Sequence, residues 1–206
     1  MLFAAKYNEV KGRVRLKTII YANPTTQSYN QSILNTLIQN FEKNRQNYQV
    51  IDLYRDKFNP VLSAADRIIF DDGKTTDQKV RDYQEVIKNS TELYFIFPIW
   101  WYDMPAILKG FMDKVLLNHF AYQENTTGHL VGLLQNINQV DIITTSTATQ
   151  EFIEKHGNFI RGIFIENILP DVGIPASRSE WIHFGKVNLT TDDVRKKFLA
   201  DLPDRI

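Results

Sequence analysis

The chain contains no cysteine, which excludes disulfide bonds, a thiolate nucleophile and any cysteine-ligated metal site. It also has no net charge, because 24 Lys and Arg residues balance 24 Asp and Glu residues. A neutral chain has no strong field to attract nucleic acid or an acidic membrane surface. No apolar run approaches transmembrane length, and Leu2–Ala5 is too short for the apolar region of a signal peptide. We therefore expect a cytoplasmic protein with no integral membrane segment and no nucleic-acid partner.

Two common nucleotide-binding motifs are missing as well. No G-x-G-x-x-G and no Walker lysine follow the first strand-like run, so neither a dinucleotide Rossmann site nor a P-loop is expected. A metal site is not expected either. Asp71-Asp72-Gly73 is typical of a turn, and the four histidines show no metal-ligand spacing; they are His119, His129, His156 and His183.

What the chain does show is an alternation of strand and helix patterns. Strands are predicted at 18–22, 48–53, 93–97 and 140–145, with the last strand region beginning at 171–174 and 181–187 extending it. Between them lie helical patterns, one of which, at 157–169, is predicted to bury Phe159, Ile160, Ile163 and Phe164. The alternation predicts an α/β three-layer sandwich with a five-stranded parallel sheet. We assign it the order 2-1-3-4-5, which is one of the two orders common in such sheets. We assign residues 1–17 to an N-terminal extension and 18–206 to this domain.

Residues 93–116 are predicted to form the centre of the sheet and the loop beside it. The unbroken apolar run Leu93–Phe97 is typical of a strand covered on both faces. Pro98 should end the hydrogen-bonded ladder because it has no N–H to donate. Three aromatic residues follow at 100–102, and Pro105 is suited to the start of a helix. The loop therefore leaves the carboxyl end of a parallel strand, where ligands of open α/β sheets bind.

This stretch resembles the NAD(P)H:quinone oxidoreductases with a flavodoxin-like fold, the NAD(P)H dehydrogenase (quinone) type. The resemblance lies in Phe97-Pro98-Ile99-Trp100-Trp101-Tyr102, in Met104-Pro105-Ala106-Ile107-Leu108-Lys109-Gly110 and in Asp113-Lys114-Val115. It implies an enzyme that passes a hydride from NAD(P)H through a bound flavin, FMN or FAD, to a quinone or similar small acceptor. It also implies a homodimer whose sites include residues of both chains.

The resemblance implies cofactor-binding roles for residues of three loops. They are Asn23, Gln27, Ser28, Tyr29 and Asn30 near the flavin phosphate, Pro98, Ile99, Trp100, Trp101 and Tyr102 along the ring, and Thr145, Ser146 and Thr147 in the third loop. Many relatives have Thr-Thr-Gly-Gly in that third loop, where glycine lets the backbone approach the flavin closely. An alternative for the first loop is plain helix capping by Ser28 or Asn30.

The resemblance also implies residues that handle the substrates. Trp101, Tyr102 and Phe120 would form an aromatic wall for nicotinamide and quinone, with Tyr122 beside them as a further substrate-binding residue. Tyr102, Phe152 and His156 would be the catalytic residues. Phe152 stands where some relatives have a tyrosine, and His156 stands near their charge-stabilising histidine but at a shorter spacing, so a surface or helix-end histidine is the alternative. Backbone N–H groups near Ile99, Trp100 and Ser146 would stabilise negative charge on the ring.

Two other functions remain open from the sequence. One is a non-enzymatic electron carrier of the flavodoxin type, although those proteins are typically shorter and strongly acidic. The other is a redox-sensing regulatory subunit of a potassium efflux system, because relatives with this role can also reduce quinones. Binding of a membrane partner would favour this second alternative.

Overall fold

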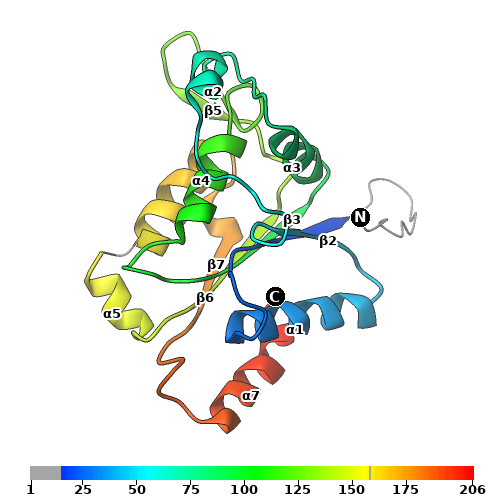
Figure 1. The fold of residues 1–206 in the computed structure, drawn as a ribbon, viewed down its shortest axis with the longest axis vertical. Helices are drawn as coiled ribbons and strands as arrows, with labels where there is room; N and C mark the ends of the chain where they lie inside the picture. Colours follow the sequence, from blue (N-terminus) through cyan, green and yellow to red (C-terminus); the bar gives the residue numbers. More distant parts are fainter. Residues whose placement is uncertain (1–14, 158) are drawn as a thin grey trace.

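The structure, a computed structural model, describes residues 15–157 and 159–206. Its central sheet has five parallel strands in the order β2-β1-β3-β6-β7. The strands are β1 (Leu16–Tyr21), β2 (Asn47–Asp52), β3 (Glu92–Pro98), β6 (Gln139–Thr145) and β7 (Ser179–Phe184). The predicted order 2-1-3-4-5 is confirmed (Figure 1).

Helices cover both faces of this sheet (Figure 1). On one face lie α1 (Tyr29–Lys43) and α7 (Asp192–Asp201). On the other lie α3 (Gln78–Lys88), α4 (Ala106–Val115) and η1 (Phe159–Ile168). Successive residues of β3 enter opposite cores, Phe95 on the α4 side and Tyr94 on the α1 side. This double burial explains why the strand reads as one unbroken apolar run.

The remaining elements are short. They are α2 (Ala64–Ile69), α5 (Gln150–Lys155), α6 (Leu169–Asp171), the antiparallel pair β4 (Tyr122–Glu124) and β5 (Leu130–Gly132), and the 3-10 turns Ala176–Arg178 and Leu202–Asp204. Among the described residues, no helix combines the length and apolar character needed to cross a membrane.

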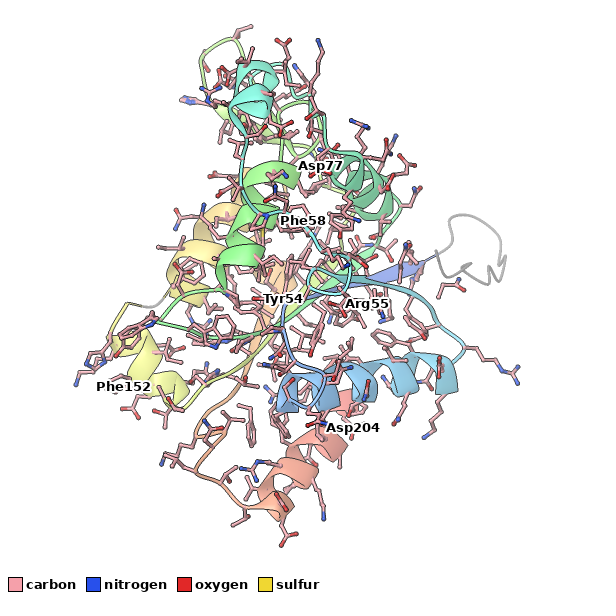
Figure 2. The ribbon with its side chains drawn as sticks, in the orientation of Figure 1. Tyr54, Arg55, Phe58, Asp77, Phe152 and Asp204 are labelled. Carbon is pink, nitrogen blue, oxygen red and sulfur yellow. The ribbon has the colours of Figure 1, made fainter. Side chains whose placement is uncertain are left out.

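An aromatic contact and a buried cation hold α4 against its neighbours. Phe58 packs against Tyr83 of α3 and Phe111 of α4, with ring centroids 5.7 and 6.3 Å away (Figure 2). Lys114 is almost fully buried and donates to the Asn59 carbonyl and to the Asp77 carboxylate, both at 2.8 Å. Because the charge is paired and hydrogen-bonded, its burial is tolerated. The aromatic loop therefore leads directly into a helix, α4, that is firmly packed against its neighbours.

The first and third strands differ slightly from the prediction. β1 begins at Leu16, so two residues assigned to the extension belong to the sheet; residues 1–14 of that extension lie outside the described residues. Pro98 does not end the ladder, because the N–H of the next residue, Ile99, donates to the Thr145 carbonyl at 2.8 Å. A proline removes only its own donor, and the bond on its far side still forms.

Two predictions for the last third of the chain are wrong. Residues 171–174 do not start the final strand: Asp171 ends α6, and a turn follows in which the Gly173 and Ile174 N–H groups bond back to residues 170 and 169. Ile163 is not part of a buried stripe, because it is 48% exposed while Ile165 is buried. The helix is π-wound, and its i→i+5 bonds widen each turn and rotate Ile163 outward.

Candidate functional site

Three loops predicted from the sequence meet at the carboxyl edge of the sheet. They follow β1, β3 and β6, the neighbouring strands of the sheet's middle. The Ala22 N–H donates to the Ile96 carbonyl at 3.0 Å, and the bond from the Ile99 N–H to the Thr145 carbonyl links the loop after β3 to the end of β6. The Asn30 amide, from the first turn of α1, donates to the Thr145 hydroxyl at 3.0 Å. These bonds bring residues far apart in the sequence to one edge.

A pocket of about 440 Å³ opens between the second and third of these loops. Its lining comes from the β3–α4 loop, the β6–α5 loop and α5, namely Ile99, Trp101, Tyr102, Ser146, Thr147, Ala148, Thr149, Phe152 and Ile153. Six of these residues carry predicted roles, so the structure brings most of the second and third loops together. Figure 2 shows Phe152 on α5, near the outer edge of the molecule.

The loop after β3 is a tight turn in a strained conformation. Trp100 and Asp103 exchange both backbone bonds, N–H to carbonyl, at 3.0 and 3.1 Å. The two residues between them, Trp101 and Tyr102, have φ of 51° and 66°. Such a turn usually takes Asn-Gly, because left-handed φ costs other residues about 1–2 kcal/mol each. Trp101 is also 94% exposed in this turn, and backbone strain of this kind clusters at functional sites.

The predicted catalytic residues form a continuous stack along the pocket rim. The Phe152 ring lies 6.2 Å from Tyr102 with an interplanar angle of 28°, and 4.0 Å from the His156 imidazole with an angle of 22°. His156 ends α5, and its Nδ1 lies 2.8 Å from the Phe152 carbonyl. A carbonyl only accepts, so Nδ1 carries the hydrogen in this bond. The helix-end alternative for His156 is therefore correct as a description of its position, and the stack places it beside the pocket.

The backbone N–H groups of Ile99, Trp100 and Ser146 are already engaged. They donate to the carbonyls of residues 145, 103 and 184 respectively, so the predicted donors near these residues would have to come from their neighbours. The N–H groups of Trp101, Tyr102 and Thr147 have no acceptor within the described part of the chain. All three belong to pocket-lining residues. Strand pairing and turn closure use the first set, and the second set is left for a ligand in the pocket.

The third loop has its own side-chain bonds in place of the glycines of the relatives. Neither Ser146 nor Thr147 has a positive φ, so the backbone does not require glycine here. The Ser146 hydroxyl accepts from the Ala148 N–H at 3.0 Å and donates to the Ala148 carbonyl at 2.9 Å. The imidazole Nε2 of His183, from β7, lies 3.2 Å from both of those oxygens. Burial lowers the pKa of His183, which keeps the ring neutral.

The first loop uses several predicted side chains inside the protein. Asn23 is buried, and its Oδ1 accepts from the Thr25 N–H and hydroxyl. Ser28 caps α1 by accepting from the Gln31 N–H at 3.1 Å, as in the capping alternative. The Tyr29 hydroxyl donates to the Arg195 carbonyl at 2.7 Å, which turns the ring toward α7. An anion at this point would therefore be held mainly by backbone N–H groups.

Those backbone donors are present. None of the N–H groups of residues 27–30 finds an acceptor among the described residues. They precede and begin a helix of 15 residues, whose N-terminus carries a partial positive charge. Together with the aromatic pocket and its three uncommitted N–H groups, this donor set fits a planar cofactor that carries a phosphate, such as a flavin. Within the described ranges no group of three or more His, Cys, Asp or Glu residues is arranged to hold a metal ion.

Phe120 and Tyr122 do not reach this pocket in the single chain. They follow the carboxyl end of α4, whereas the pocket lies near its amino end, and they lead into the β4–β5 pair at the top of Figure 1. Both rings are half-buried against the core. Sequence reasoning missed Ala148, Thr149, Ile153 and His183. No motif marks them, and only the pairing of β6 with β7 brings His183 to the third loop.

Comparisons with known proteins agree with this geometry. Residues 17–178 match the family described as flavodoxin-like fold. An uncharacterized NAD(P)H oxidoreductase of Haemophilus influenzae is 30% identical over 192 residues, which is 88% of this chain and 89% of the relative. The crystal structure of Smu.1420 from Streptococcus mutans UA159 is 29% identical, with a TM-score of 0.78 and coverage of 92% and 97%. A ribosyldihydronicotinamide dehydrogenase [quinone] of Pongo abelii is 29% identical over 120 residues, about half of each chain (50% and 52%).

Proposed function

The chain belongs to the flavodoxin-like fold family, and on this premise we propose that it is a flavin-dependent NAD(P)H oxidoreductase that reduces a quinone or similar small acceptor. The observation that carries the proposal is the pocket itself. It joins an exposed aromatic surface to three backbone N–H groups without an acceptor among the described residues, at the sheet edge where this fold binds ligands. The names of the relatives at 30% and 29% identity, an NAD(P)H oxidoreductase and a quinone dehydrogenase, agree with it.

The bound flavin would supply the redox chemistry, by accepting a hydride from NAD(P)H and returning two electrons to the acceptor. The residues of the chain would hold and orient it. The N–H groups of residues 27–30 would bind phosphate, and the Trp101, Tyr102 and Thr147 N–H groups would contact the polar edge of the ring. Donors that are already oriented stabilise developing negative charge without reorganisation. No side-chain nucleophile is required.

Both substrates would use the same aromatic surface. Trp101, Tyr102 and Phe152 border one opening, so nicotinamide and acceptor would stack there in turn, with His156 at the rim. Successive occupation of one site produces ping-pong kinetics. Parallel lines in a double-reciprocal plot are therefore the expected result, and intersecting lines would contradict the shared pocket.

A second copy of the chain would complete the acceptor side of the site. Phe120 and Tyr122 lie beyond the far end of α4, so their proposed substrate contacts require the pocket of a partner subunit. We expect a homodimer, and light scattering of the purified protein would measure its mass. A monomeric mass would remove Phe120 and Tyr122 from the proposed site and leave the pocket of the single chain unaffected. A cytoplasmic location, where NAD(P)H is available, belongs to the same proposal and is testable by cell fractionation.

The deciding experiment is a visible spectrum of the purified protein after incubation with FMN or FAD, followed by anaerobic addition of NAD(P)H. Flavin bands that bleach and then return when a quinone is added would support the proposal and identify the cofactor. Bound flavin that NAD(P)H does not reduce would favour an electron carrier. If neither flavin is retained, the proposal fails.

A further inference from the structure

The β6–α5 loop, residues 146–149, forms one side of the pocket and is held by the end of β7 and by the residues that follow it. The Ser146 N–H donates to the Phe184 carbonyl at 3.2 Å, and the Val187 N–H donates to the Ser146 carbonyl at 3.0 Å. Gly185 packs so closely that an added Cβ would lie 2.6 Å from the Ala148 carbonyl oxygen. The end of β7 and the segment after it thus act as a cradle for the loop.

His183 is the polar side chain of β7 that contacts this loop. Its Nδ1 lies 2.8 Å from the Thr144 hydroxyl, and the indole Nε1 of Trp181 donates to the same hydroxyl at 2.8 Å. An indole N–H can only donate, so the hydroxyl uses a lone pair for Trp181 and has its own hydrogen to offer to Nδ1. The Ala148 carbonyl can only accept, so Nε2, which lies 3.2 Å from this carbonyl oxygen and from the Ser146 hydroxyl, carries the hydrogen of the imidazole. In the neutral ring Nδ1 then has no hydrogen and accepts from the Thr144 hydroxyl.

This chain of bonds has one direction and ends at the pocket. It runs from Trp181 through Thr144 and His183 to Ala148, whose neighbour Thr147 has an N–H without an acceptor among the described residues. The Ser146 hydroxyl closes the same turn from within the loop. Because neither Ser146 nor Thr147 has a left-handed φ, the loop conformation depends on these side-chain bonds and not on glycine.

We propose that His183 is a positioning residue of the candidate flavin site, which acts through the Ala148 carbonyl and the Ser146 hydroxyl to present the Thr147 N–H to the ring. The inference rests on the proposed function, because it assigns that N–H to a flavin. His183 itself is absent from the pocket lining. Its effect on the flavin is therefore indirect.

The test compares His183→Leu, which removes both nitrogens, with His183→Gln, whose amide retains an acceptor and a donor. Thr18→Val is the matched control. It removes a buried hydroxyl that bonds Ser90 at 2.7 Å near the amino ends of the strands, away from the pocket. Each variant is titrated with FMN and with FAD, using quenching of flavin fluorescence to measure the dissociation constant. Thermal unfolding without flavin measures the stability of each.

His183→Leu is expected to weaken flavin binding about tenfold, the equivalent of ~1.4 kcal/mol. His183→Gln should recover most of that affinity, and Thr18→Val should keep the wild-type affinity at a comparable loss of thermal stability. Equal flavin affinity in the wild type and in His183→Leu would overturn the inference and leave the proposed function standing. If the wild type binds no flavin, both are overturned.

A second measurement needs no cofactor. Hydrogen exchange of the flavin-free protein reports the opening of individual amides. The Ser146 and Ala148 amides should exchange faster in His183→Leu than in the wild type, and should be unchanged in Thr18→Val. If these amides exchange at wild-type rates in His183→Leu, the imidazole does not hold the loop and the inference falls.

Discussion

At the scale of single residues, the most informative feature is the turn that carries Trp101 and Tyr102. Two large aromatic residues occupy left-handed positions that glycine or asparagine would adopt more readily. Trp101 gains almost nothing from burial in return, because the residue is 94% exposed. A conformation that costs stability and exposes an indole is consistent with selection for a contact outside the folded chain, which here would be a substrate or a second subunit.

Replacing Trp101 by asparagine should therefore separate stability from function. Trp101→Asn is expected to stabilise the flavin-free protein by about 0.5–1 kcal/mol, because asparagine tolerates a positive φ. The same change should raise the KM for the acceptor, because the stacking surface is lost. Denaturant unfolding and steady-state kinetics measure the two effects.

The control for this variant is Leu189→Asn. Leu189 is also highly exposed, at 77%, but has no positive φ and lies outside the pocket. Leu189→Asn should therefore relieve no backbone strain and should leave the KM for the acceptor unchanged. A Trp101→Asn protein that is less stable than the wild type would show that the turn is not strained in the way described.

At the scale of elements, β6 has different chemistry at its two ends. Its carboxyl end supplies Thr145 and the pocket loop, whereas its amino end buries Asp141 completely. Gln139 donates to one carboxylate oxygen at 2.8 Å, and the other oxygen has no partner among the described residues. Burial is the main cause that raises the pKa of Asp141 to about 6, and the carboxylates of Glu180 and Glu92 act in the same direction. The fold therefore opposes ionisation of this group.

The raised pKa of Asp141 makes the folded chain less stable at neutral pH than at acidic pH. Because the pKa of Asp141 is higher in the folded than in the unfolded chain, its contribution to the free energy of unfolding falls as pH rises from about 4 to about 6, and stays low above that. Asp141→Asn, which cannot ionise, should be more stable than the wild type at pH 7 by up to about 3 kcal/mol. The difference should vanish near pH 4.

Denaturant unfolding at several pH values between 4 and 7.5 measures this difference. Asp204→Asn, a change at an exposed carboxylate near the C-terminus, is the control and should leave the pH profile unchanged. If Asp141→Asn is less stable than the wild type at pH 7, the carboxylate is better solvated or better paired than its burial indicates.

At the scale of the whole molecule, the site exists because parallel strands end at one edge. Residues near 27–30, 99–102 and 145–149 lie far apart in the sequence, yet β1, β3 and β6 are adjacent in the sheet and all run the same way. The carboxyl ends of such strands meet around one crevice. Helices lie on both faces of the sheet (Figure 1), and the pocket opens at this edge.

Much of this arrangement could be predicted from local patterns. Unbroken apolar runs such as Leu93–Phe97 marked strands buried on both faces, and helical spacing marked α1, α3 and α4. The stripe in η1 was assigned wrongly at Ile163, because a π-helix does not follow the 3.6-residue period that the prediction assumed. The last strand was placed too early, because apolar residues near 172–174 belong to the core without joining the sheet.

By itself, the sequence determined the fold class, because the alternation of strand and helix patterns depends on local periodicity. It determined the strand order and the aromatic loop only through the resemblance of residues 97–115 to a known family. Only the tertiary structure decided which backbone N–H groups find an acceptor, because those of Ile99 and Ser146 pair with residues of other strands. It also decided that His183 reaches the pocket loop and that Phe120 does not, because both depend on which segments the folded sheet brings together. Long-range contacts of this kind carry no local sequence signal.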